Sequence, residues 1–248
     1  MPNGQNDLGL RTRLDVLIRE EQDLTWSGHD RLGPVVQLGE RAVASLNTFV
    51  ASVDAEYPFA AALMLSIHKA TTLAFLSILR KHLAQSQLNQ RLVIEYTSLT
   101  AYMLAHPDSP MVGPSKDDPA KLVPSKKVTD SAYKWIASAL PAQSDFLKER
   151  KNQINDTLSH ANIYGSHFTF DWDGTDEGIF KGSFFDVTNI AVEQAYMLSF
   201  VQTIIIVVYT LTEVADKHGG FVIQNGSRWT LQKLAADTDA YTKALKTE

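Results

Sequence analysis

An uncharged stretch between Glu193 and Glu213 limits the architecture of this chain more than any other feature. Residues 194–212 read QAYMLSFVQTIIIVVYTLT and carry no charged side chain. A helix that is apolar nearly all round is either the central helix of a bundle or a membrane span. Six Gln, Ser and Thr residues interrupt the run, and no basic residues flank it to give a positive-inside signal. Both observations favour a buried core helix over a membrane span.

The rest of the chain is dominated by apolar residues at helical spacing. Leu92, Tyr96, Leu99 and Met103, for example, follow one another at intervals of four, three and four residues, which places them on one helix face. The fold class expected is therefore mostly α, an up-and-down helical bundle. Helices are predicted at about 10–24, 36–53, 58–84, 88–104, 129–139, 142–161, 187–215 and 230–246.

Two segments break the helical pattern. Residues 167–185 alternate, turn through a Gly- and Asp-rich stretch and alternate again, so one small β-hairpin is predicted at about 166–185, between the sixth helix and the long apolar helix. Five of the nine prolines fall within 107–124, which predicts an exposed loop over 106–127.

The predicted elements compose one helical domain over the whole chain, because the helices on either side of the proline-rich loop are too few for two cores. Its parts are N-terminal helices at 1–56, a bundle core at 57–216 and a C-terminal helix at 217–248.

Composition excludes several classes of protein. The chain has no cysteine, which rules out disulfides, cysteine-ligated metal sites and thiol catalysis. Its net charge of −5 gives no overall basic field for nucleic acid. The first residues hold no long apolar run, so a cytoplasmic protein without a secretory signal is expected. Phosphate-binding glycine loops, the GxSxG elbow and the HExxH motif are all missing, and no cofactor or metal is expected.

The end of the sixth predicted helix carries the first candidate site. Asp156 and His160 are four residues apart, so they share a helix face and can hydrogen-bond. A carboxylate beside an imidazole fixes its tautomer and favours its charged form, as does the C-terminal end of a helix. The alternative is a histidine that only satisfies the last carbonyl groups of the helix, which is a common stop signal.

A second candidate lies on the predicted helix at 88–104. Arg91 and Glu95 are four residues apart among apolar neighbours that include Tyr96, so a partly buried ion pair is predicted. The alternative is an ordinary exposed pair of small energetic value. If this pair packs against the His160 end, the two form one polar pocket, to which His68 could add although it reads more simply as a core histidine.

This order of features resembles the HEPN-like helical bundles over about residues 57–216: an R-x-x-x-E helix, a later helix ending in Ser159-His160, a small hairpin and a long apolar helix. HEPN domains of the nuclease type share an Arg-polar-x-x-x-His motif that cleaves RNA without metal, usually across a dimer. The matching window here runs from Asn155 to His160 and has Asn155 where the family has arginine. Asparagine stabilises a phosphorane less strongly than arginine does.

Two hypotheses follow from these residues. The first is a non-catalytic HEPN-like module that binds a protein partner, a nucleotide or RNA, with a homodimer as one arrangement. The alternative is a variant metal-independent ribonuclease in a toxin or phage-defence role, with His160, Asp156 and Asn155 at the catalytic position. In either case Arg91, Glu95, Tyr96 and Ser159 are the candidate binding residues.

Overall fold

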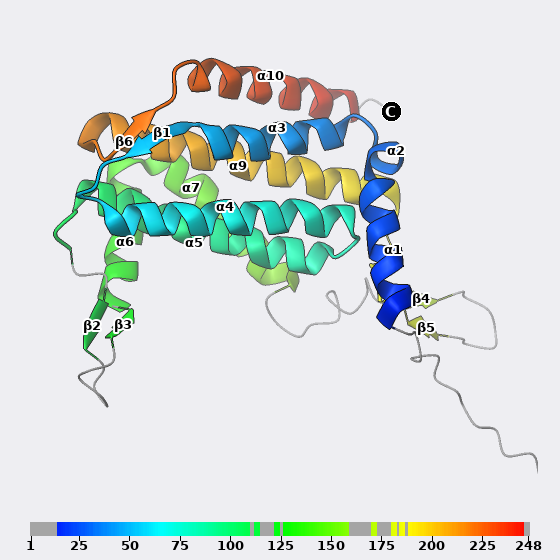
Figure 1. The fold of residues 1–248 in the computed structure, drawn as a ribbon. Helices are drawn as coiled ribbons and strands as arrows, with labels where there is room; N and C mark the ends of the chain where they lie inside the picture. The colour runs from blue at the N-terminus through cyan, green and yellow to red at the C-terminus, as the bar shows by residue number, and fades with distance from the viewer. Residues whose placement is uncertain are drawn as a thin grey trace, which may run out of the picture.

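A computed structural model shows a helical bundle with small antiparallel strand pairs, which confirms the predicted fold class. Four helices run side by side along its length: α3 (Val35–Thr48), α4 (Pro58–Leu79), α5 (Leu83–Ala105) and α9 (Ile190–His218) (Figure 1). The structure describes residues 14–109, 112–114, 122–124, 126–158, 170–172, 180–182, 184–186 and 188–245.

The remaining helices surround these four. α10 (Ser227–Leu245) lies across α3 and α9, while α6 (Lys126–Ala139) and α7 (Pro141–Leu158) pack on α5 and on each other (Figure 1). α1 (Leu14–Trp26) and the short α2 (Gly28–Leu32) stand at one end of the bundle, with α1 directed away from it (Figure 1). α1 contains no fully buried residue, so it contributes little to the core.

The uncharged run lies in α9. α9 contacts α3, α5, α7 and α10, and its N-terminus is capped by the Asn189 side chain, which accepts a hydrogen bond from Val192 N at 2.9 Å. By length and composition, both α4 and α9 could cross a membrane. Half of the apolar window of α4 and 72% of that of α9 are buried inside the protein.

The apolar core draws on every described helix from α2 to α10. It includes Leu32, Leu46, Ile94, Phe200 and Leu234, each at most 1% exposed. Within the segment 1–56, predicted as N-terminal helices, α2 and α3 contribute to this core: Leu32 of α2 and Val35, Val36 and Ala42 of α3 are fully buried.

Two predicted boundaries are wrong, for reasons of packing. No helix was predicted between residues 24 and 36, but α2 begins there at Gly28. The missing side chain of Gly28 leaves room for Leu79, since an added Cβ would lie 2.8 Å from that leucine. The predicted helix at 36–53 stops at Thr48. Its last residues form β1 (Val50–Val53), which pairs with β6 (Phe221–Ile223) far along the chain.

The predicted hairpin is confirmed by β4 (Phe170–Trp172) and β5 (Phe180–Gly182), whose register pairs Asp171 with Lys181. The predicted loop at 106–127 also contains a short antiparallel pair, β2 (Val112–Pro114) and β3 (Leu122–Pro124), and α6 begins before that loop was expected to end. Each strand ends in a proline, a position where the missing N–H removes the fewest hydrogen bonds between the strands.

Candidate functional site

The predicted Arg91–Glu95 pair exists and reaches a second helix. Arg91 Nε donates to Glu95 Oε1 at 3.1 Å, and Lys151 Nζ of α7 lies 3.0 Å from the same oxygen. Lys151 also donates to the Tyr133 hydroxyl of α6 at 2.8 Å. The described α7 residue that meets the pair is therefore Lys151. The two cations share one carboxylate, so each has an oppositely charged neighbour, although the positive groups outnumber the carboxylate.

Burial and hydrogen bonding act in opposite directions on the groups of this cluster. Burial lowers the pKa of Lys151, but hydrogen bonds to Tyr133 and Glu95 outweigh it and leave the pKa raised. Burial raises the pKa of Tyr133, and the nearby Lys151 only partly opposes that rise. Lys151 therefore stays charged and Tyr133 stays neutral at physiological pH.

Of the other predicted site residues that the structure describes, none forms a hydrogen bond or ion pair with the Arg91–Glu95 pair. Tyr96 is half-buried and packs against the apolar core. Asn155 is half-buried and Asp156 is exposed near the end of α7, while Ser159 and His160 lie outside the described residues. His68 is half-buried and hydrogen-bonds to the backbone of Leu46 in α3, so it does not join Arg91 and Glu95; burial lowers its pKa.

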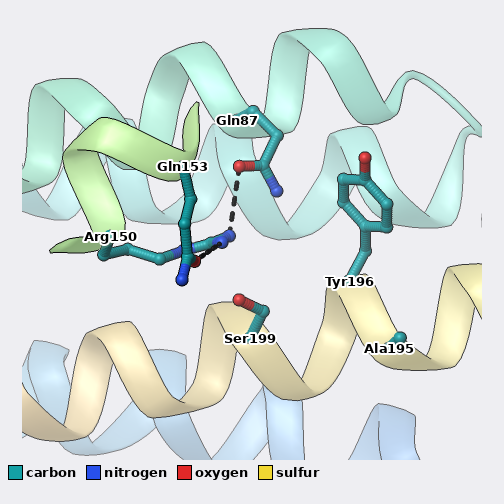
Figure 2. Close-up of a pocket in the computed structure, with 6 residues that line it drawn as sticks. All are labelled: Gln87, Arg150, Gln153, Ala195, Tyr196 and Ser199. Atoms are coloured by element: carbon teal, nitrogen blue, oxygen red, sulfur yellow. Dashed lines mark hydrogen bonds between the residues drawn. The ribbon is translucent and has the colours of Figure 1, made fainter. Parts of the chain in front are cut away.

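A different side chain of α7, Arg150, occupies the centre of a polar cavity. Leu147 and Ile154 are buried on one face of α7, and Arg150 follows the first by three residues and precedes the second by four. That spacing turns the arginine inward, towards α5 and α9. Figure 2 shows its guanidinium between Gln87 of α5 and Ser199 of α9.

The guanidinium of Arg150 is held by amide oxygens. Its NH2 group donates to Gln87 Oε1 at 3.1 Å and its NH1 group donates to Gln153 Oε1 at 3.2 Å (Figure 2). The same NH2 group also donates to Gln90 Oε1 at 3.1 Å. Its buried Nε has no hydrogen-bond partner among the described residues. Within the described part of the chain, no carboxylate pairs with Arg150. Amide oxygens satisfy donors but do not neutralise a charge.

Burial lowers the pKa of Arg150, which is the expected effect of removing a cation from water, while the nearby Tyr196 acts in the opposite direction. An arginine remains protonated despite such a shift. The site therefore holds a positive charge that its described neighbours do not compensate.

The cavity beside Arg150 measures about 310 Å³ and opens between α5, α7 and α9. Its lining is Gln87, Arg150, Gln153, Ala195, Tyr196 and Ser199 (Figure 2). Behind it, the fully buried Gln90 donates to Ser86 Oγ at 3.2 Å. This contact fixes the Gln90 amide with its oxygen towards Arg150, so the positive group is oriented before any ligand arrives.

A second buried ionic cluster lies at the start of α9 and has the opposite character. Glu193, only 1% exposed, forms an ion pair with Arg31, lies 3.3 Å from Lys81 Nζ and accepts a hydrogen bond from Thr188 at 3.1 Å. Arg31 also donates to the carbonyl of Leu79 at 2.6 Å. These contacts join α2, the α4–α5 turn and α9, which makes the cluster a structural lock.

Asp186 closes the same end of the bundle. Its carboxylate accepts a hydrogen bond from Leu83 N at the start of α5, and its own N–H donates to Lys81 O at 2.8 Å. Lys81 adopts a left-handed conformation, with φ of 58°, that makes the α4–α5 turn tight. Burial raises the pKa of Asp186, and the Leu83 N–H and the cations nearby oppose that rise only in part.

Sequence reasoning missed Arg150, Gln87 and Gln90. The signal was present in the spacing, since Arg150 stands where the apolar pattern of α7 requires a core residue. Gln87 and Gln90 likewise stand at buried positions of α5. A charged residue at a core position is costly unless it is paired, so such a position is a reasonable place to look for a ligand site.

Known proteins give no further guide to the site. A scan against protein-family models and searches of curated proteins and solved structures found no match to this chain. The HEPN-like resemblance therefore stays a prediction. Among the described residues, no group of three or more His, Asp and Glu side chains could hold a metal ion.

Proposed function

We propose that this protein is a non-catalytic helical binding module that holds a small phosphate-bearing ligand of nucleotide size in the Arg150 cavity. The observation that carries the proposal is the uncompensated charge of Arg150. A guanidinium forms two parallel hydrogen bonds with a phosphate or carboxylate, and these are among the stronger polar contacts in proteins.

The size and lining of the cavity agree with this ligand class. About 310 Å³ is at the lower end of the range for small-molecule sites. Glutamine amides and the Ser199 hydroxyl can bind polar groups of the ligand, and Ala195 supplies apolar surface. Among the described residues of the lining, no histidine or carboxylate is placed to act as a general base, which favours binding over catalysis.

Isothermal titration calorimetry tests the proposal, with AMP and inorganic phosphate as probes for the full chain. We expect AMP to bind the natural protein and to bind Arg150→Met at least tenfold more weakly, because the charge-assisted contacts are lost. Arg228→Met is the matched control, since Arg228 is an exposed arginine paired with Asp216 on another face. AMP binding that is indifferent to Arg150, or absent from the folded natural protein, would contradict the proposal.

The ribonuclease alternative stays a prediction, since His160 and Ser159 lie outside the described residues. Its support is that the same α7 carries Arg150, a cation free of carboxylate partners among the described residues, ahead of Asn155. RNA cleavage in EDTA by the natural protein, and its loss in His160→Ala, would support this alternative. Cleavage by neither protein would favour the binding module.

A further inference from the structure

A second cavity lies on the other side of α7, where Tyr133, Lys134 and Ala137 of α6 face Lys148 and Lys151 of α7. It measures about 360 Å³ and is lined by Ser98, Tyr133, Lys134, Ile136, Ala137, Ser144, Leu147, Lys148, Lys151 and Asn152. It is separate from the Arg150 cavity, because Arg150 points to α9 whereas Lys151 points to α6. The Arg150 proposal therefore does not depend on it.

The floor of this second cavity is apolar. Ile136 and Leu147 are 1% and 3% exposed, and Ala137 adds a small side chain at the mouth. The hydroxyl of Ser98, on the α5 side, donates to the carbonyl of Ile94 at 3.1 Å, so its donor is already satisfied. A flat apolar body can therefore enter without leaving this donor unpaired.

The rim of the cavity is positively charged. Lys134 and Lys148 are exposed, lie on the two helices that form the walls, and have no ion-pair partner within the described part of the chain. Lys151 is different, because Glu95 and Tyr133 already engage it. Lys134 and Lys148 therefore lie at the rim of a cavity whose floor is apolar. This arrangement suits a molecule with an apolar body and one anionic end.

We propose that the α6–α7 cavity is a second ligand site and binds an amphipathic anion, an aromatic or aliphatic acid whose apolar part rests on Ile136 and Leu147 while its carboxylate faces Lys134 and Lys148. Aromatic groups of two fused rings fit a cavity of about 360 Å³. The lysines act through the field at the rim, so added salt weakens binding.

Calorimetry with 2-naphthoate, and with neutral 2-naphthamide as its uncharged counterpart, tests this site. We expect the acid to bind the natural protein more tightly than the amide. Ala137→Trp, which fills the mouth, should abolish binding of the acid. Ala139→Trp is the matched control, because Ala139 is exposed on the same helix and does not line the cavity.

Charge reversal tests the rim. The double variant Lys134→Glu, Lys148→Glu should weaken naphthoate binding about tenfold, as expected for two rim charges. Lys69→Glu, Lys233→Glu changes the net charge equally at exposed lysines on α4 and α10 and should leave binding unchanged.

Circular dichroism first confirms that each variant is folded. Three results would overturn the proposal: no binding to the folded natural protein, naphthoate binding that survives Ala137→Trp, or equal affinity for the acid and the amide. Equal weakening by both charge-reversal pairs would also overturn it, since net charge alone would then explain the effect.

Discussion

Arg31 and Arg150 are both arginines whose pKa is lowered by burial, yet they lie in opposite electrostatic surroundings. Arg31 faces Glu193, a carboxylate only 1% exposed, and so belongs to a closed ionic lock. Arg150 faces the amide oxygens of Gln87, Gln90 and Gln153 beside a cavity. The comparison sets a buried cation neutralised by a carboxylate against one whose described partners are neutral amides, and the proposed ligand site rests on this difference.

The largest effect on stability is expected when the ionic cluster of Arg31, Lys81 and Glu193 loses its carboxylate. Glu193→Gln keeps the shape of the side chain but leaves Arg31 and Lys81 without a buried counter-charge. The free energy of unfolding, measured by urea denaturation, should fall by about 3–5 kcal/mol. Glu213→Gln, at a half-exposed carboxylate paired with Lys217, is the control and should cost about 1 kcal/mol or less. Equal losses for the two variants would remove the distinction between lock and surface pair.

The second prediction concerns Arg150 itself. No described carboxylate depends on Arg150, but the buried oxygens of Gln87 and Gln90 lose their donor in Arg150→Met, so the free energy of unfolding should fall by about 1–2 kcal/mol, while AMP affinity falls at least tenfold. Urea denaturation and calorimetry on the same preparation separate the two effects. A loss of stability above about 3 kcal/mol would instead make Arg150 a structural residue like Arg31.

The third prediction concerns Asp186, the carboxylate at the same end of the bundle as the Glu193 cluster, and how stability depends on pH. Burial raises the pKa of Asp186, so the folded carboxyl group binds its proton more tightly than the unfolded one. Its contribution to stability is full below the unfolded value of about 3.9 and is lost as pH rises through the folded value. Asp186→Asn should therefore gain stability relative to the natural protein as pH rises from about 4. Denaturation series at several pH values measure this difference, and parallel curves for the two proteins would contradict it.

The smallest effect is expected at the partly exposed pair on α5. Arg91 is 35% exposed and Glu95 29%, and Lys151 remains on Glu95 when Arg91 is removed. Arg91→Ala should lower the free energy of unfolding by about 0.3–0.5 kcal/mol, and less in high salt. If Arg91→Ala lowered the free energy of unfolding as much as Glu193→Gln, the Arg91–Glu95 pair would be a structural ion pair like that of Arg31 and Glu193.

Much of the fold could be predicted because its signals are local. The spacing of Leu92, Tyr96 and Met103 predicted α5, and the alternation around residues 170–182 predicted β4 and β5. Gly219, with φ of 79°, follows the last residue of α9, which is a common position for glycine at the end of a helix. The β1–β6 pair was missed because its partners are about 170 residues apart, and no local pattern in Val50–Val53 distinguishes a strand from the end of a helix.

The candidate site could be predicted only in part. The i,i+4 rule placed Arg91 against Glu95, but the third member, Lys151, comes from another helix. Arg150 was not among the candidate residues, although its spacing from Leu147 and Ile154 marks a core position. Whether a charge at such a position is compensated depends on side chains from other helices.

By itself, the sequence determined the fold class, the central position of α9 and the location of the hairpin, because helical periodicity and turn residues act over a few neighbours. The tertiary structure alone decided which buried charges are paired. Glu193 meets Arg31 across 162 positions, whereas Arg150 meets glutamines about 60 positions away. Electrostatic compensation is set by distance in space, so only the packing of α2, α5, α7 and α9 separates the structural lock from the open cavity.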